Sequence, residues 1–108
     1  MLKKVNRLAK AKDIRTTLGR GRAFFNPYFS VKFLRKATPS RFTVVVSTKV
    51  YKSAVKRNRL KRVVRELLRH RLPELPQGDY LISTKPKISS LPENQRLRLF
   101  LDLISKIR

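Results

Sequence analysis

The chain has no cysteine, no tryptophan and a single histidine among its 108 residues. Without cysteine it forms no disulfide, thiolate nucleophile or cysteine-ligated metal site, and this composition fits a reducing cytosol. Apolar runs are a handful of residues long, far below the ~20 that a membrane-spanning helix needs. The N-terminal segment also lacks the apolar core of a signal peptide. We therefore expect a cytoplasmic protein with no membrane partner.

Acidic residues are scarce as well. Only 6 Asp and Glu stand against 28 Lys and Arg, which gives a formal net charge of +22. Self-repulsion on this scale opposes compaction unless a polyanion neutralises it, and nucleic-acid phosphates attract Lys and Arg regardless of sequence. The basic residues run through the whole chain rather than forming a tail. The composition therefore predicts one folded nucleic-acid-binding domain over residues 1–108.

The sequence shows no protein active site. The lone His70 lies beside Arg69 and Arg71 at the end of a basic segment, where it is better suited to capping a helix than to catalysis. The six carboxylates are scattered, with no pair close enough in sequence to suggest two-metal hydrolysis. Serine and threonine lack a plausible base. We predict no catalytic residue and leave the metal ligands unassigned.

Three segments have helical spacing of apolar residues. The first covers about residues 9–18, and Gly19 and Gly21 are predicted to end it in the left-handed conformation. The second runs from Ser53, a suitable N-cap, to about His70. The third begins near Pro92, a residue favoured in a first helical turn.

Strand-like alternation of apolar and polar residues occupies the intervals between these helices. Residues 28–35 and 41–47 alternate around a short link, which predicts an antiparallel hairpin. Residues 80–84 form a third strand, and a further strand is possible near 49–51. The order helix-strand-strand-(strand)-helix-strand-helix predicts a mixed α+β fold, with three helices packed on a small sheet.

The second helix carries the strongest functional signal. At ~100° per residue its apolar stripe lies opposite a row of basic residues. The apolar stripe consists of Leu60, Val63, Val64, Leu67 and Leu68. The polar side opposite it consists of Asn58, Lys61, Arg62, Arg65 and Arg69. Arginine is suited to phosphate because its planar fork bonds two oxygens at once. The helix therefore packs by one face and presents a cationic ridge to nucleic acid.

The segment Ala54-Val55-Lys56-Arg57-Asn58-Arg59-Leu60-Lys61-Arg62-Val63-Val64-Arg65-Glu66 resembles the signature helix of the bacterial ribonuclease P protein. The core of that helix is an Arg-Asn-Arg box followed by a basic pair. Weaker matches follow in the family's order at Asn6-Arg7-Leu8, Val45-Val46-Ser47-Thr48-Lys49, Asp79-Tyr80-Leu81-Ile82 and Lys85-Pro86. The resemblance thus covers nearly the whole chain.

The resemblance implies a small α/β sandwich, with a four-stranded mixed sheet, three helices and a left-handed β-α-β crossover around the signature helix, against the usual handedness. It also implies the protein subunit of an RNA-based endoribonuclease. The signature helix would bind the catalytic RNA, and a cleft between the first helix and the sheet would receive the 5′ leader of precursor tRNA. Mg²⁺ would serve the RNA-protein holoenzyme, with no cofactor bound by the protein alone.

Carried over by position, the resemblance assigns two sets of residues. The RNA-binding set is Lys49, Lys52, Lys56, Arg57, Asn58, Arg59, Lys61, Arg62, Arg65 and Arg69. The leader-cleft set is Ile14, Leu18, Tyr28, Phe29, Phe33 and Phe42, although each ring is equally consistent with an ordinary core residue. Two departures stand out. Ile14 and Leu18 replace aromatic residues usual in the family, and Val50-Tyr51-Lys52 replaces a turn that often contains glycine.

Three other interpretations remain open. A structural RNA-binding protein of the ribosome has the same composition, and only the Arg-Asn-Arg helix with its flanking order favours the ribonuclease subunit. A DNA-binding module is disfavoured because helix-turn-helix spacing and dimerising heptads are missing. A cationic membrane-surface protein is disfavoured because the strands need the apolar face of the basic helix for a core.

Overall fold

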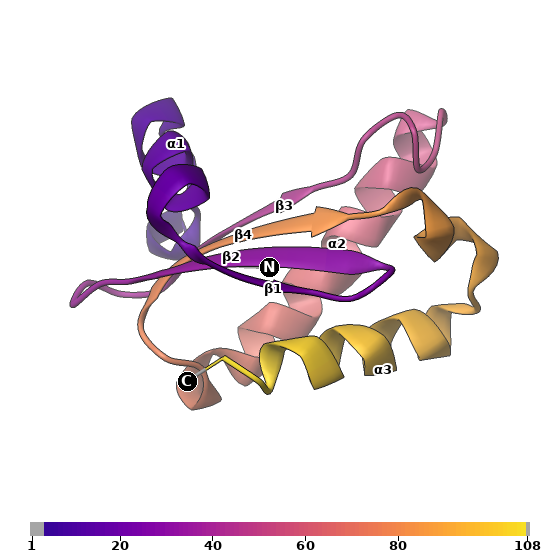
Figure 1. Cartoon of the computed structure of the whole chain (residues 1–108). Helices are drawn as coiled ribbons and strands as arrows, with labels where there is room; N and C mark the ends of the chain where they lie inside the picture. The colour runs from indigo at the N-terminus through magenta and orange to yellow at the C-terminus, as the bar shows by residue number, and fades with distance from the viewer. Residues whose placement is uncertain (1–3, 108) are drawn as a thin grey trace.

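In the computed structural model, which describes residues 4–107, the apolar alternation seen in the sequence builds a four-stranded mixed sheet (Figure 1). Its strands are β1 (Arg22–Phe25), β2 (Phe29–Arg35), β3 (Arg41–Val45) and β4 (Gly78–Thr84). The helices are α1 (Ala11–Arg20), α2 (Ala54–Arg71) and α3 (Glu93–Ile104). Short 3₁₀ turns cover Lys4–Asn6, Leu72–Glu74 and Pro86–Ser90. The α+β class and the three predicted helices are confirmed.

The strand order is β1-β2-β4-β3, so β4 lies between β2 and β3. It runs antiparallel to β2 and parallel to β3, which makes α2 the crossover between two adjacent parallel strands. The predicted hairpin of residues 28–35 with 41–47 is therefore wrong. The physical reason is burial: six of the seven β4 residues are buried, and a strand covered on both faces lies inside a sheet rather than at its edge.

The fourth strand also differs from the prediction. It is β1, which pairs antiparallel with β2 at the edge of the sheet. Residues 49–51 form part of a turn between β3 and α2 instead. The short sequence Arg22-Ala23-Phe24-Phe25 has too few alternating positions to stand out as a strand, and only its pairing with the longer β2 fixes it.

One face of the sheet is closed by α2 and α3, which together bury a single apolar core. From α2 this core takes Leu60, Val64 and Leu68, with Leu67 partly buried against it, so four of the five residues of the predicted apolar stripe contact the core. Ring contacts dominate on the strand side. The Phe33 and Phe42 ring centroids lie 4.7 and 4.8 Å from that of Tyr80, and Phe29 lies 5.1 Å from Phe100. Offset and tilted aromatic pairs of this kind add stability beyond the area they bury.

The opposite face is covered at one end only, by α1 (Figure 1). Charged groups hold this helix in place. The Arg41 guanidinium donates to both carboxylate oxygens of the fully buried Asp79, at 2.8 and 2.7 Å, and to Asp13 of α1 at 3.0 Å. Lys36 adds a contact of 2.9 Å to Asp79. Burial disfavours the Asp79 carboxylate, but the hydrogen bonds from Arg41 and Lys36 outweigh it and lower its pKa below the usual value.

The end of α1 corrects a second expectation. Gly19 lies inside the helix, which continues to Arg20, and Gly21 has an extended backbone with φ −68° rather than a left-handed one. A Cβ atom at Gly21 would lie 2.4 Å from the Thr17 carbonyl oxygen and 3.2 Å from that of Phe33. Glycine is therefore required here for a close approach of helix to strand rather than for a left-handed turn.

The other two helices begin as predicted. The Ser53 hydroxyl accepts from the backbone N–H of Lys56, so Ser53 is the N-cap of α2. Pro92 precedes the first turn of α3. The cap fixes where the basic segment becomes helical, and so which of its side chains face solvent.

Candidate nucleic-acid interface

The basic helix α2 borders a groove at the outer edge of β3, which we call the β3-edge groove. The groove has a volume of about 570 Å³. Its lining consists of Arg7, Leu8, Ala9, Ile14, Phe42, Thr43, Asn58, Arg62, Arg65 and Glu66. The N-terminal segment forms one wall because the Leu8 N–H donates to the Phe42 carbonyl at 2.8 Å, which places residues 7 and 8 alongside β3. Three segments distant in sequence thus meet around one hollow.

The charges in this groove favour an anion. Arg7, Arg62 and Arg65 supply three cations against the single carboxylate of Glu66. That carboxylate also accepts from the Arg69 guanidinium at 3.0 Å, and this hydrogen bond lowers the pKa of Glu66. Asn58 adds a neutral donor and acceptor to the same wall. Of the predicted RNA-binding residues, Asn58, Arg62 and Arg65 are those that the fold brings together here.

The remaining predicted RNA contacts lie in different surroundings. Arg57 donates to the carbonyls of Tyr51 and Lys52, at 2.9 and 2.8 Å, and so ties down the turn before α2. Lys56 and Arg59 face α3, on the other flank of the helix. Lys49, Lys52 and Arg69 are exposed and lie outside the β3-edge groove. Lys61 is half-buried. The set is therefore not one uniform surface, and Arg57 has a structural task of its own.

The sheet face toward α1 is largely uncovered, and we call it the open sheet face. Successive strand residues point to opposite sides, and the strand register aligns them in rows across the sheet. The face consists of Ala23 and Phe25 of β1, Ser30 and Lys32 of β2, Leu81 and Ser83 of β4, and Thr43 and Val45 of β3. Arg41 and Asp79 lie in the row that α1 covers. Polar and small residues dominate the rows beyond α1.

The aromatic residues predicted for a leader cleft do not lie on this face. Phe29, Phe33 and Phe42 occupy the alternate positions and are 1–2% exposed in the core beneath α2 and α3. No base can stack on such rings without unfolding the core, so their assignment as stacking residues is wrong. Phe42 reaches only the lining of the β3-edge groove, and Tyr28 is half-buried just before β2. The ordinary-core interpretation holds for all three buried rings.

An aromatic residue missing from the prediction does lie on the open sheet face. Phe25 is 69% exposed, and the Lys85 ammonium lies 5.1 Å from its ring centroid. An exposed ring beside a cation can stack a base and hold its phosphate. The only sequence signal was a pair of aromatics, Phe24-Phe25, before Asn26-Pro27, and one member of any such pair must face away from the core once the segment is a strand.

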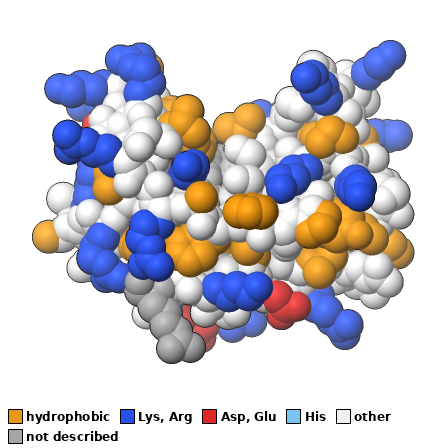
Figure 2. Space-filling model, viewed as in Figure 1, with side chains coloured by type: hydrophobic (Ala, Val, Ile, Leu, Met, Phe, Trp, Pro, Cys, Tyr) orange, Lys and Arg blue, Asp and Glu red, His pale blue; other side chains and the backbone are white. Residues whose placement is uncertain are grey.

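Figure 2 shows the open sheet face as a saddle between two lobes, viewed as in Figure 1. The lobe at upper left is α1, and the lobe at upper right lies where β3 leads into α2. Lys and Arg side chains stand on both lobes, while hydrophobic side chains lie lower in the saddle. On α1, Leu18 is 54% exposed and Ile14 is half-buried in the β3-edge groove, so both predicted residues provide apolar wall rather than rings.

The carboxylates of the described residues do not form a metal site. No group of three or more His, Asp or Glu side chains gathers anywhere in residues 4–107. Five of the six carboxylates contact Arg or Lys: Asp13, Glu66, Glu74, Asp79 and Glu93. Mg²⁺ prefers several oxygen ligands in octahedral geometry, and this donor set does not fit it. In the same range, no helix has the length and apolarity to cross a membrane.

Comparison with known proteins agrees with the fold and the basic helix. The family described as Ribonuclease P matches residues 2–108 of the chain. The chain belongs to this family. The ribonuclease P protein component of Pseudanabaena sp. (strain PCC 6903) is 36% identical over 99 residues, which cover 90% of this chain and 85% of the relative.

A second relative and one solved structure show how far this likeness extends. The ribonuclease P protein component of Xanthomonas oryzae pv. oryzae (strain MAFF 311018) is 40% identical over 81 residues, or 75% of this chain. That match spans only 56% of the Xanthomonas protein's length. The ribonuclease P protein of Thermotoga maritima superposes with a TM-score of 0.83 at 30% identity, over 94% of this chain and 97% of the other. The ribonuclease P protein fold is therefore shared over nearly the full length described.

Proposed function

We propose that this chain is the protein subunit of a ribonuclease P, which binds the catalytic RNA and the 5′ leader of precursor tRNA to promote 5′-end maturation. The observation that carries the proposal is the position of Thr43. This residue lines the β3-edge groove beside Asn58 and Arg62, and it also lies in the central row of the open sheet face. A catalytic RNA on α2 and a single strand on the sheet would therefore be neighbours.

The groove has the chemistry to hold the catalytic RNA. Arg62 and Arg65 would each bond phosphate oxygens through their planar guanidinium groups, and Asn58 would read a base edge or a 2′-hydroxyl. The contacts are charge-assisted and exposed to solvent at their outer ends, so affinity should fall steeply with salt. This division assigns the catalytic RNA to α2 and leaves the sheet for substrate.

The open sheet face has the chemistry to hold an unpaired strand. Phe25 offers the exposed ring, and Lys32 and Lys85 supply cations on either side of it along the sheet. Stacking is tolerant of sequence because every base has a π face, which suits leaders that differ from one precursor to the next. Ile14 and Leu18 would bound the strand on the α1 side without stacking.

The protein would act by affinity and position, and bond cleavage would take place on the RNA. Because the described carboxylates do not fit Mg²⁺, we propose that the holoenzyme's Mg²⁺ ions are held by RNA groups. Orienting a substrate in this way accounts for large rate effects without a protein base or nucleophile. Both proposed partners are RNA, with no part for DNA or a membrane. Maturation of the precursor tRNA would take place in the cytoplasm.

The test is cleavage of a precursor tRNA by a bacterial ribonuclease P RNA at low Mg²⁺, with and without the protein. The wild-type chain should restore leader removal. Arg65→Ala should weaken binding of the catalytic RNA by about 10-fold, since it removes a charge-assisted contact. Arg98→Ala is the matched control, because Arg98 is an exposed arginine of α3 outside the groove. It should lose only the small share due to net charge.

A ribosomal-type RNA-binding protein is the alternative, favoured by the +22 charge alone. It predicts tight, salt-dependent RNA binding without any effect on leader removal. That result would contradict the proposed function, as would equal losses for Arg65→Ala and Arg98→Ala.

A further inference from the structure

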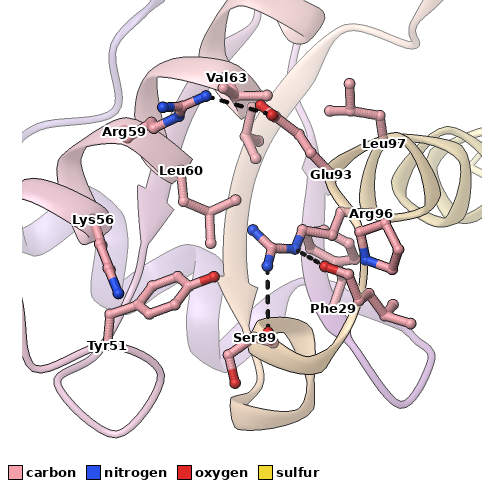
Figure 3. Close-up of a pocket in the computed structure, with 13 residues that line it drawn as sticks. Phe29, Tyr51, Lys56, Arg59, Leu60, Val63, Ser89, Glu93, Arg96 and Leu97 are labelled. Atoms are coloured by element: carbon pink, nitrogen blue, oxygen red, sulfur yellow. Dashed lines mark hydrogen bonds and ion pairs between the residues drawn. The ribbon is translucent and has the colours of Figure 1, made fainter.

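A second hollow lies on the other flank of α2, facing α3, and we call it the α2–α3 hollow (Figure 3). Its volume is about 400 Å³, within the range of small-molecule pockets. The apolar part of the lining consists of Phe29, Leu60, Val63, Val64, Leu91, Pro92 and Leu97. The rest consists of Tyr51, Lys56, Arg59, Ser89, Glu93 and Arg96. Apolar surface and cations thus meet in one concave site.

Tyr51 is the centre of this arrangement. Its half-buried ring lies between two cations, with the Lys56 ammonium and the Arg96 guanidinium each 5.9 Å from the ring centroid. Figure 3 shows the hydroxyl end of Tyr51 and the side chain of Leu60 pointing into the hollow. An aromatic ring with cations on its rim can stack a base and hold the attached phosphate at the same time.

The cation Arg96 is fixed in place by the protein itself. Its Nε donates to the Leu91 carbonyl at 2.8 Å, and its Nη2 reaches the Ser89 carbonyl at 3.4 Å. These bonds, drawn as dashed lines in Figure 3, join α3 to the preceding 3₁₀ turn and to the residue that follows that turn. A group held in this way loses little conformational freedom when a ligand binds, which favours affinity.

The rim carries a loosely bound cation. Arg59 lies 3.6 Å from Glu93, and the two side chains are 74% and 49% exposed. Exposed pairs of this kind contribute little, so a phosphate can displace Glu93 from Arg59 at small cost. With Lys56 and Arg96, the hollow then offers three cations against one carboxylate, and its charge is complementary to an anion.

We propose that the α2–α3 hollow takes one unpaired nucleotide of the catalytic RNA, with its base against Tyr51 and its phosphate on Lys56 and Arg59. The inference rests on the proposed function for the identity of the ligand. It goes beyond it in location, because the β3-edge groove lies on the opposite flank of α2. The basic helix is thus bound by RNA on both flanks rather than along one ridge.

Two features favour a nucleotide over a protein side chain as the occupant. The lining combines an apolar floor with a net excess of two cations, whereas a protein ligand of that charge would need an acidic and apolar segment together. Unpaired RNA bases are commonly splayed out and stacked on aromatic or Arg planes, and a base with its phosphate matches both parts of this lining.

The first pair of variants is Tyr51→Leu and Tyr51→Phe, measured by equilibrium binding to a bacterial ribonuclease P RNA at fixed salt. Tyr51→Phe keeps the ring and should bind like the wild type within about 2-fold. Tyr51→Leu removes the stacking surface and should lose roughly 5- to 100-fold. Thermal unfolding of each variant shows whether Tyr51→Leu retains the folded domain.

The second pair is Lys56→Gln and Lys106→Gln. Each variant removes one positive charge from an exposed position, Lys56 near the start of α2 and Lys106 beyond the end of α3. Lys106 lies beyond α3 and outside the hollow, so it reports the effect of net charge alone. Lys56→Gln should lose several-fold more affinity than Lys106→Gln. Because Tyr51 and Lys56 would hold one nucleotide, their double variant should lose less than the product of the single losses.

The outcomes separate this inference from the function beneath it. If the wild-type chain does not bind the catalytic RNA, the proposed function is wrong, and the α2–α3 hollow loses its proposed ligand as well. Suppose instead that the wild type binds the catalytic RNA and Arg65→Ala binds it weakly, while Lys56→Gln and Lys106→Gln have equal affinities. In that case the α2–α3 hollow is not an RNA site, and only this inference is overturned. That second comparison decides the matter even if Tyr51→Leu does not fold.

Discussion

The two faces of the sheet differ in burial and in the residues they carry. Toward α2 and α3, the strands place Phe29, Val31, Phe33, Val44 and Ile82, all of which are at most 4% exposed. Toward α1, most of the alternate positions hold polar or small residues, with one strongly exposed ring at Phe25. One register of residues therefore builds the core, and the register between them builds the candidate substrate surface.

This contrast shows that the number of aromatic residues in a strand says little about how many rings a ligand can reach. The rings buried beneath α2 and α3 stabilise the domain, because aromatic side chains are large and bury much apolar area. The ring that we propose for RNA stacking is the exposed Phe25 on an edge strand. Variants on the two faces should therefore fail in different ways, the core face in stability and the open face in affinity.

The largest effect is expected on the closed face. Phe33→Ala should lower the free energy of unfolding by about 3–5 kcal/mol, because it leaves a cavity beside Tyr80 in a fully packed core. Domains of this size have about 5–15 kcal/mol in total, so the variant should be marginally folded. Urea denaturation followed by circular dichroism measures the loss. A stable Phe33→Ala that binds precursor poorly would reverse the assignment of the two faces.

The next effect concerns the charged row that holds α1 over the sheet. Asp79→Asn should lower stability at pH 7 by about 2 kcal/mol, since it leaves Arg41 and Lys36 without their buried partner while both remain partly exposed to water. The folded pKa of Asp79 is below that of the unfolded chain, near 3.9. Its stabilisation is therefore fully present above about pH 4 and is lost as pH falls further through the folded pKa.

Urea midpoints of the wild type and Asp79→Asn, measured from pH 7 to pH 3, test this linkage. The difference between the two proteins should stay constant down to about pH 4 and narrow below it. A difference that changes between pH 5 and pH 7 would show that another group controls the position of α1.

The smallest effect is expected on the open face. Phe25→Leu should leave the unfolding midpoint unchanged, because the side chain is mostly in water. Affinity of the holoenzyme for precursor tRNA should fall about 5-fold, at the low end of values for one stacked base. Mature tRNA, which lacks the leader, is the control substrate and should bind both proteins equally. A loss shared by both substrates would remove Phe25 from the leader path.

Much of this arrangement followed from local sequence. The capping serine at Ser53 and the apolar stripe of α2 were predictable because helix caps and 3.6-residue periodicity are local signals. The basic residues of the β3-edge groove were predictable for the same reason. Sequence could place Asn58, Arg62 and Arg65 on the solvent side of α2, although not the N-terminal segment that faces them.

The features that could not be predicted from the sequence depend on which strands pair with one another in the sheet. Alternation alone does not say which register of β2 faces α1, and so Phe29 and Phe33 could be taken for a cleft as readily as for the core. The insertion of β4 between β2 and β3 is a long-range choice that no turn in the link 36–40 reveals. Phe25 was missed because four-residue β1 exists only through its pairing with β2.

The lack of cysteine makes one measurement especially direct, because a single introduced thiol can carry an iron-EDTA cleavage probe. Attached at Ser83→Cys on the open sheet face, the probe should cut precursor tRNA within the 5′ leader when the protein is bound to the catalytic RNA. Attached at Ser105→Cys, just after α3, it should leave the leader intact. Leader cleavage from Ser105→Cys and none from Ser83→Cys would contradict the assignment of the open sheet face to substrate.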